Sequence, residues 1–135
     1  MSIMTKTVLV IEDNEQNLYL LRFLLEKHGF HVDEARDGRE GIRLASQLRP
    51  DLILLDIQLP MLDGYAVAIE LRKDPGLRAT AIIVVTSHAM VGDREKALAA
   101  GATDYIEKPI NPSTFVDQIR KHLPSSSENE QEKKE

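Results

Sequence analysis

Polar side chains that could bind a metal ion and a phosphoryl group directly follow four short strand-like runs of the sequence. The runs are 8–11, 52–55, 82–85 and 104–107, and the residues that follow them are Glu12 with Asp13, Asp56, Thr86, and Lys108 with Pro109. If the runs are parallel strands, these groups converge on the carboxyl edge of one sheet, where open α/β folds bind their ligands. Three carboxylates, one hydroxyl and one ammonium at one place indicate a divalent cation and a phosphoryl group.

The three carboxylates would repel one another and raise each other's affinity for protons. Bound Mg²⁺ would remove this penalty, because it prefers oxygen ligands and retains some of its water. An aspartate can also act as a nucleophile toward phosphorus and form an aspartyl phosphate. Thr86 could donate a hydrogen bond to one phosphoryl oxygen, and Lys108 could place its charge beside another. The pattern therefore predicts phosphoryl transfer, which depends mainly on positioning and charge neutralisation.

Length and composition limit the class of protein. A chain of 135 residues with 42% apolar and 29% charged residues fits one folded domain with its own core. No apolar stretch approaches the roughly 20 residues that span a bilayer, and residues 1–6 lack the apolar region of a secretory signal. The net charge of −5, without a cluster of Lys and Arg, argues against nucleic-acid binding. The absence of cysteine fits a cytoplasmic protein.

Strand-like runs alternate with helical patterns, which predicts repeated βα units in one α/β domain over residues 6–123. The expected helices are 15–28, 37–48, 65–73, 93–101 and 111–123. Gly29 and Gly101 end two of them, and Asn111 with Pro112 begins the last. Residues 1–5 form an N-terminal extension. Residues 124–135 contain no apolar side chain and predict a disordered tail or linker.

The polarity of the strands predicts their order in the sheet. The first, third and fourth strands are almost entirely aliphatic, as expected when helices cover both faces. The second strand, 31–35, and the fifth, 104–107, alternate with polar residues and should lie at the edges. We therefore expect a doubly wound, flavodoxin-like sheet of five parallel strands in the order 2-1-3-4-5, with five helices. Its switch point lies between strands one and three, which lead to Asp13 and Asp56.

The same residues resemble the receiver domain of two-component response regulators. The matching stretches are 8–14, 51–60, 63–64, 86–89 and 101–109. Each stretch alone is a weak signal, but their combination and order are specific, and the resemblance covers about residues 6 to 123. Two departures are mild: Glu12 replaces the more usual Asp, and Ser87 stands where Ala is frequent.

The resemblance implies a role for each residue of the site. Asp56 would be the phosphoacceptor, and Thr86 and Lys108 would hold the phosphoryl group. Mg²⁺ would bind to Asp13, to Asp56 and to the backbone carbonyl of Gln58, with Glu12 acting mainly through metal-bound water. The Lys108–Pro109 bond would be cis, which aims the lysine.

Three further residues have two interpretations each. Tyr105 would be an aromatic switch that turns inward when Thr86 moves, or else an edge-strand tyrosine with a hydrated hydroxyl. Gln58 and His88 would tune hydrolysis by contacting the attacking water, or else be ordinary surface residues.

The resemblance also implies a signalling module and not an enzyme. Its phosphoryl donor would be a phosphohistidine on a histidine kinase or a phosphotransfer protein. The surface formed by residues 93–123 would then change and bind a downstream protein target. The helix over 93–101 has few large apolar anchors, mainly Leu98, so it could move at modest cost. We expect a monomer with no output domain, no nucleic acid and no membrane partner, and an activation-linked dimer stays open.

The helix over 15–28 carries more apolar residues than one buried stripe requires. The surplus could be a docking surface for the histidine-bearing partner, with Leu20 and Phe23 at its centre. The alternative is a well-buried helix under the side of the sheet that the first and second strands form.

Other functions fit the residues less well. Each site residue alone has an ordinary structural explanation, such as Asp13 capping a helix. These separate explanations do not account for four strand ends that all carry residues suited to the same chemistry. A phosphatase of the haloacid dehalogenase type would need a second Asp where Gln58 stands. A nucleotide or flavin binder would need a glycine-rich first turn, and residues 12–16 are instead acidic and polar.

Overall fold

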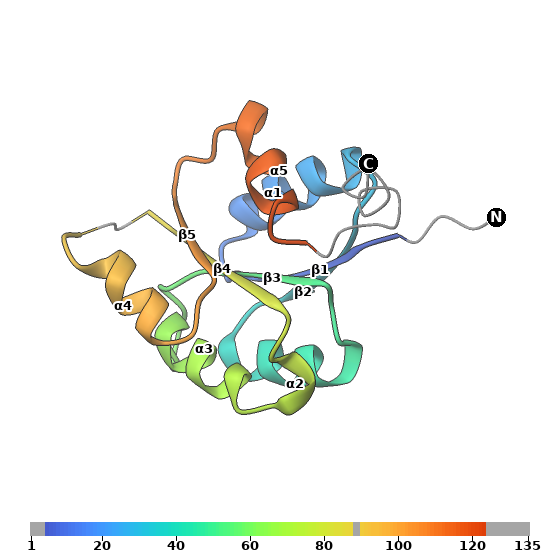
Figure 1. The fold of residues 1–135 in the computed structure, drawn as a ribbon. Helices are drawn as coiled ribbons and strands as arrows, with labels where there is room; N and C mark the ends of the chain where they lie inside the picture. Colours follow the sequence, from blue (N-terminus) through green and yellow to red (C-terminus); the bar gives the residue numbers. More distant parts are fainter. Residues whose placement is uncertain (1–4, 88–89, 124–135) are drawn as a thin grey trace, which may run out of the picture.

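The computed structural model describes residues 5–87 and 90–123, which form a parallel sheet covered by helices on both faces (Figure 1). The strands are β1 (Thr7–Ile11), β2 (His31–Ala35), β3 (Leu52–Leu55), β4 (Ala81–Thr86) and β5 (Asp104–Glu107). Their order is β2-β1-β3-β4-β5, and each neighbouring pair is parallel. The expected doubly wound fold and its strand order are therefore confirmed.

Five α-helices and one short 3₁₀ helix connect the strands. They are α1 (Glu15–Lys27), α2 (Gly38–Leu48), α3 (Gly64–Arg72), η1 (Pro75–Leu77), α4 (Asp93–Ala99) and α5 (Pro112–Arg120). Helices α1 and α5 lie on one face of the sheet, and α2 and α3 lie on the other (Figure 1). Helix α4 lies beside the β5 edge, where it contacts that strand.

The central strands supply apolar side chains to both faces because successive residues of a strand point in opposite directions. Val8 and Val10 of β1 pack under α1 and α5. Leu9 and Ile11 pack against α2 and α3. All four side chains are buried, as the unbroken aliphatic runs indicate for a sheet covered on both sides.

Short polar side chains begin most of the helices. Asp37, Asp63 and Asn111 accept hydrogen bonds from the first turns of α2, α3 and α5. Gly29 and Gly101 follow α1 and α4 with φ of 90° and 114°, a conformation that favours glycine. The expected helices therefore form. Their ends lie within three residues of the expected ones, with the largest shift at the end of α5, and α3 begins one residue earlier than expected.

The residue that packs helix α4 against the sheet is not the expected one. Leu98 is 39% exposed, whereas Ala97 is fully buried. Ala97 packs with Val84 and Ala102. Leu98 is therefore not the anchor, because it lies on the outer side of the helix; a methyl group holds α4 to the sheet.

Two expectations concern segments that lie almost wholly outside the described residues. They are the N-terminal extension, 1–5, and the tail, 124–135. Among the helices of the described part of the chain, none combines the length and the apolar character needed to cross a bilayer.

Candidate metal and phosphoryl site

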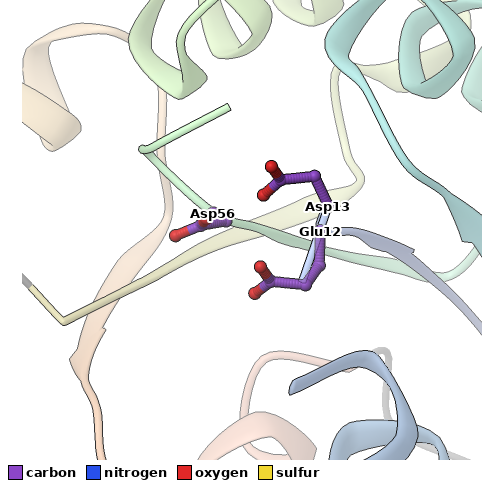
Figure 2. A group of neighbouring side chains, drawn as sticks. All are labelled: Glu12, Asp13 and Asp56. Carbon is purple, nitrogen blue, oxygen red and sulfur yellow. The ribbon is translucent and has the colours of Figure 1, made fainter. Parts of the chain in front are cut away.

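The three carboxylates expected to bind a metal come together at the carboxyl edge of the sheet. Residues Ile11 and Leu55 pair in the β1–β3 ladder, so the residues that follow them leave the sheet side by side. Oxygens of Glu12, Asp13 and Asp56 all lie within 4.8 Å of one another. Figure 2 shows the three carboxylates pointing into one space from the ends of β1 and β3. The donor set is all oxygen, which fits a hard cation such as Mg²⁺.

Lys108 lies between two of these carboxylates. Its Nζ is 2.8 Å from Glu12 Oε1 and 3.7 Å from Asp56 Oδ1. All three side chains are at least 89% buried, so the ion pairs are poorly screened by water. The other Glu12 oxygen accepts from the backbone N–H of Asn14 at 3.2 Å. Glu12 thus has both oxygens engaged by the protein, which suits the indirect metal role implied by the resemblance.

The Asp56 carboxyl has a perturbed pKa. Burial is the main cause and raises its pKa from 3.8 to about 6, with a further rise from the negative charge of Glu12. The ammonium of Lys108 and a backbone hydrogen bond from Gln58 oppose this rise. A cation bound among the carboxylates would favour the ionised form and reverse the shift.

The chain after Asp56 approaches it closely because Gly64 has no side chain. A Cβ at Gly64 would overlap the Asp56 carbonyl oxygen and lie 2.7 Å from Ile57 Cα. The Gly64 N–H donates to the Ile57 carbonyl at 2.9 Å, and Asp63 caps α3 by accepting from Ala66 N–H at 2.9 Å. The Asp-Gly pair therefore closes the loop that leads from Asp56 to α3.

A pocket of about 300 Å³ opens above the carboxylates. Gln58 and Lys108 line it, together with Asn17 and Ser87. The sequence interpretation gave no role to Asn17 and regarded Ser87 only as a small neighbour. The signal for Asn17 was its position one turn into α1, facing the same edge as Asp13. The pocket is polar and large enough for a phosphoryl group with water.

Thr86 is the last residue of β4 and is 1% exposed. Its carbonyl accepts from the Lys108 N–H at 2.8 Å, which ties the ends of β4 and β5 together. The Lys108–Pro109 peptide bond is cis. Thr86 does not line the pocket, whereas the neighbouring Ser87 does. His88 lies outside the described residues.

The side chain of Tyr105 is half-buried beside α4, where it packs with Val84, Ala97 and Ala102. Its hydroxyl is buried and has no hydrogen-bond partner among residues 5–87 and 90–123. The alternative of an edge tyrosine with a hydrated hydroxyl is therefore wrong for this structure. The role of Tyr105 as a switch that turns inward when Thr86 moves stays a prediction.

Helix α1 exposes part of its apolar surface beside the site. Tyr19, Leu20 and Phe23 are 71%, 39% and 51% exposed, so the alternative of a mostly buried helix is wrong. The Tyr19 and Phe23 rings stack with centroids 6.5 Å apart. Leu20 also lines a cleft of about 120 Å³ that reaches Lys108 and Pro109. We call Tyr19, Leu20 and Phe23 the α1 patch.

The fold and the site define a class of phosphoacceptor signalling domains. The chain matches the family model of the response regulator receiver domain over residues 8–120, and it belongs to this family. Receiver domains act in two-component signalling with histidine kinases and downstream targets, and the chain has that function. A haloacid dehalogenase-type phosphatase is not favoured.

Individual response regulators and receiver domains are similar to this chain in sequence and structure. The polar-differentiation response regulators DivK of Brucella ovis and Brucella abortus are 43% identical over 120 residues, which cover 89% of this chain and 98% of each relative. Chemotaxis protein CheY4 of Vibrio cholerae matches with a TM-score of 0.84 at 27% identity, over 89% of this chain and all of CheY4. The receiver domain of sensor histidine kinase PA1611 from Pseudomonas aeruginosa matches at 0.83 and 34%, over 90% of this chain and all of that domain. That domain has a magnesium ion coordinated in its active site cleft.

Proposed function

We propose that Asp56 accepts a phosphoryl group from a phosphohistidine on a histidine kinase or a phosphotransfer protein. The observation that carries the proposal is the position of Asp56 between two other carboxylates and the ammonium of Lys108. Mg²⁺ is the proposed cofactor, held by Asp13, Asp56 and the Gln58 carbonyl. A magnesium ion in the cleft of the PA1611 receiver domain supports this choice.

The transfer exchanges one bond to phosphorus for another. A carboxylate oxygen of Asp56 bonds to phosphorus while the phosphorus–nitrogen bond breaks, and the imidazole keeps the electron pair and takes up a proton. Asp56 must be ionised for this step, and a pKa of about 6 leaves it largely ionised at neutral pH. Bound Mg²⁺ supplies positive charge that offsets the carboxylates and the incoming oxygens.

Lys108 and Thr86 hold the transferred group in this proposal. Lys108 Nζ lies 3.7 Å from Asp56 Oδ1, so a small movement of its side chain away from Glu12 places it beside a phosphoryl oxygen. Thr86 donates its hydroxyl to another oxygen. The resulting chemistry is limited to self-phosphorylation and self-dephosphorylation, within a functional unit of residues 6–123.

We propose that the switch surface consists of α4, β5 and α5. Helix α4 has seven residues and is held mainly by Ala97, so a shift costs little buried apolar area. Movement of Thr86 toward the phosphoryl group would change the packing of Tyr105, which lies between β4 and α4. The altered surface would bind a downstream protein, with the chain a monomer before activation.

The α1 patch is the proposed docking surface for the phosphohistidine partner, because its cleft leads to Lys108 and Pro109. Alanine at Leu20 and Phe23 should slow transfer from the partner but leave phosphorylation by acetyl phosphate unchanged. Leu48→Ala is the matched control, since Leu48 is 44% exposed on α2. Unchanged partner-dependent transfer in the Leu20 and Phe23 variant would exclude this surface.

The central test is the intact mass after incubation with Mg²⁺ and acetyl phosphate. The chain should gain one phosphoryl group, and Asp56→Asn should gain none. Asp63→Asn is the control, because Asn caps a helix as well as Asp does. Multiple turnover on a phosphomonoester would instead support the phosphatase. If the mass does not increase, the result contradicts the expectation that Asp56 accepts a phosphoryl group from a small donor.

A further inference from the structure

A second groove lies between α2 and α3, on the face of the sheet opposite α1 and α5 (Figure 1). Its volume is about 430 Å³, and it is lined by Arg39, Ile42, Arg43, Leu62 and Glu70. Ile42 and Leu62 are partly buried and pack against the core beneath. The groove therefore has an apolar floor with charged side chains at its rim, and it shares no residue with the phosphoryl pocket.

The charges at the rim are not balanced. Arg39 and Arg43 are exposed one turn apart on α2, and neither forms an ion pair with any described residue. Glu70 is already paired with Lys73 at 2.9 Å. Like charges four residues apart on a helix repel each other. In a chain with a net charge of −5, this rim is a local excess of positive charge.

The walls of the groove are held in place by close packing. A Cβ at Gly38 of α2 would lie 2.6 Å from Val67 Cγ2 and 3.1 Å from the Leu62 carbonyl oxygen. The helices therefore approach as closely as a glycine allows. A preformed groove loses little conformational entropy when a ligand binds.

We propose that this groove binds an acidic amphipathic segment of a partner protein. An aliphatic side chain of the segment enters between Ile42 and Leu62, and flanking carboxylates meet Arg39 and Arg43. Guanidinium groups suit this role because they bind carboxylates through two parallel hydrogen bonds. Charge complementarity selects the occupant. The acids match two arginines that form no ion pair with a described residue, although Arg43 donates a hydrogen bond to Gln47 Oε1 at 3.4 Å, and the aliphatic group matches the floor.

Other occupants match this groove less well. Residues 124–135 of the chain itself are acidic but contain no apolar side chain that could enter between Ile42 and Leu62. A second copy of the chain could offer Val91, which is fully exposed, next to Asp93 and Glu95. A contact of this kind would join two different surfaces of the molecule. It would therefore repeat from molecule to molecule and form an open chain instead of a closed dimer.

The test uses a defined probe, a short peptide with two leucines one helical turn apart, flanked by glutamates. The peptide is titrated into ¹⁵N-labelled protein, and backbone amide shifts are followed. We expect saturable shifts confined to residues 38–46 and 61–70. Arg39→Glu with Arg43→Glu should weaken binding by about tenfold or more, because two favourable charge pairs become repulsive. Replacing the peptide's leucines with serine, or its glutamates with lysine, should also abolish the shifts.

The matched control is Arg78→Glu with Lys121→Glu, which makes the same change in net charge at exposed sites outside the groove. Equal weakening in this control would show a nonspecific charge effect and overturn the proposal. Shifts centred on the α1 patch, or no saturable shifts at all, would also overturn it. Sedimentation without peptide tests whether a second copy of the chain occupies the groove. If the chain self-associates and the Arg39 and Arg43 variant does not, the occupant is another copy of the chain and not a partner protein.

Discussion

Replacing Asp56 by Asn should stabilise the metal-free chain near neutral pH. The carboxylate is buried beside Glu12, so its ionised form is disfavoured and its pKa rises from 3.8 to about 6. The amide of Asn has nearly the same shape and no charge. It removes the repulsion from Glu12 and keeps an oxygen that can accept the backbone hydrogen bond from Gln58. Among the described residues, the favourable interaction that is lost is the ion pair with Lys108 at 3.7 Å.

The raised pKa sets the sign and size of the effect. Between pH 3.8 and about 6 the folded chain binds more protons at Asp56 than the unfolded chain does. The free energy of unfolding therefore falls as pH rises through this window, and the loss persists above it. A rise from 3.8 to about 6 corresponds to about 3 kcal/mol. Allowing for the lost pair with Lys108, the Asn variant should gain about 1–3 kcal/mol near neutral pH.

The assay is thermal or urea unfolding in EDTA at several pH values. At about pH 7.5 the Asn variant should melt roughly 5–10 °C above the wild type, and the difference should vanish near pH 3.5. Mg²⁺ should raise the melting temperature of the wild type more than that of the variant. Asp63→Asn should change none of these values. A variant that is less stable than the wild type near neutral pH, or equally stabilised at both pH values, would show that the ionised Asp56 carboxylate does not destabilise the folded chain.

Three further predictions concern residues around the site. Gly64→Ala should lower the free energy of unfolding by about 1–3 kcal/mol and slow phosphorylation by acetyl phosphate, because the new Cβ meets the backbone of Asp56 and Ile57; normal stability and rate would contradict the packing. Tyr105→Phe should raise the free energy of unfolding in urea by about 1 kcal/mol, because the buried hydroxyl lacks a partner among the described residues; a loss of stability would mean that the hydroxyl is satisfied. Arg72→Met should lower it by about 2–4 kcal/mol, because the guanidinium donates to the carbonyls of Gly101, Leu77 and Thr80 at 2.8 Å each; an unchanged urea midpoint would exclude this role.

The fold follows from the sequence because the pattern of each strand reflects its surroundings. Aliphatic runs at β1, β3 and β4 require cover on both faces, and polar alternation at β2 and β5 marks the edges. The positions of Asp13 and Asp56 after β1 and β3 then place them together. Helix starts are equally local, since Asp37 and Asn111 cap the helices that follow them.

Features that depend on long-range contacts could not be predicted from the sequence. The periodicity of α4 does not show that Ala97, and not Leu98, faces the sheet. The role of Arg72 depends on the carbonyl of Gly101, 29 residues away, as well as on that of Leu77, and no local pattern encodes this arrangement. The pairing of Glu12 with Lys108 joins residues 96 positions apart, and its geometry depends on how both strands end. The α1 patch was foreseen only as a surplus of apolar residues, because exposure depends on where α5 packs.

Chemical trapping identifies the residue that accepts the phosphoryl group. The chain is incubated with Mg²⁺ and acetyl phosphate, treated with borohydride, digested and sequenced by tandem mass spectrometry. Borohydride reduces an aspartyl phosphate to homoserine and leaves a free carboxylate intact. We expect homoserine at position 56 alone, and none when Mg²⁺ is removed by EDTA. Homoserine at position 13 instead, or modification of a histidine without any homoserine, would contradict Asp56 as the phosphoacceptor.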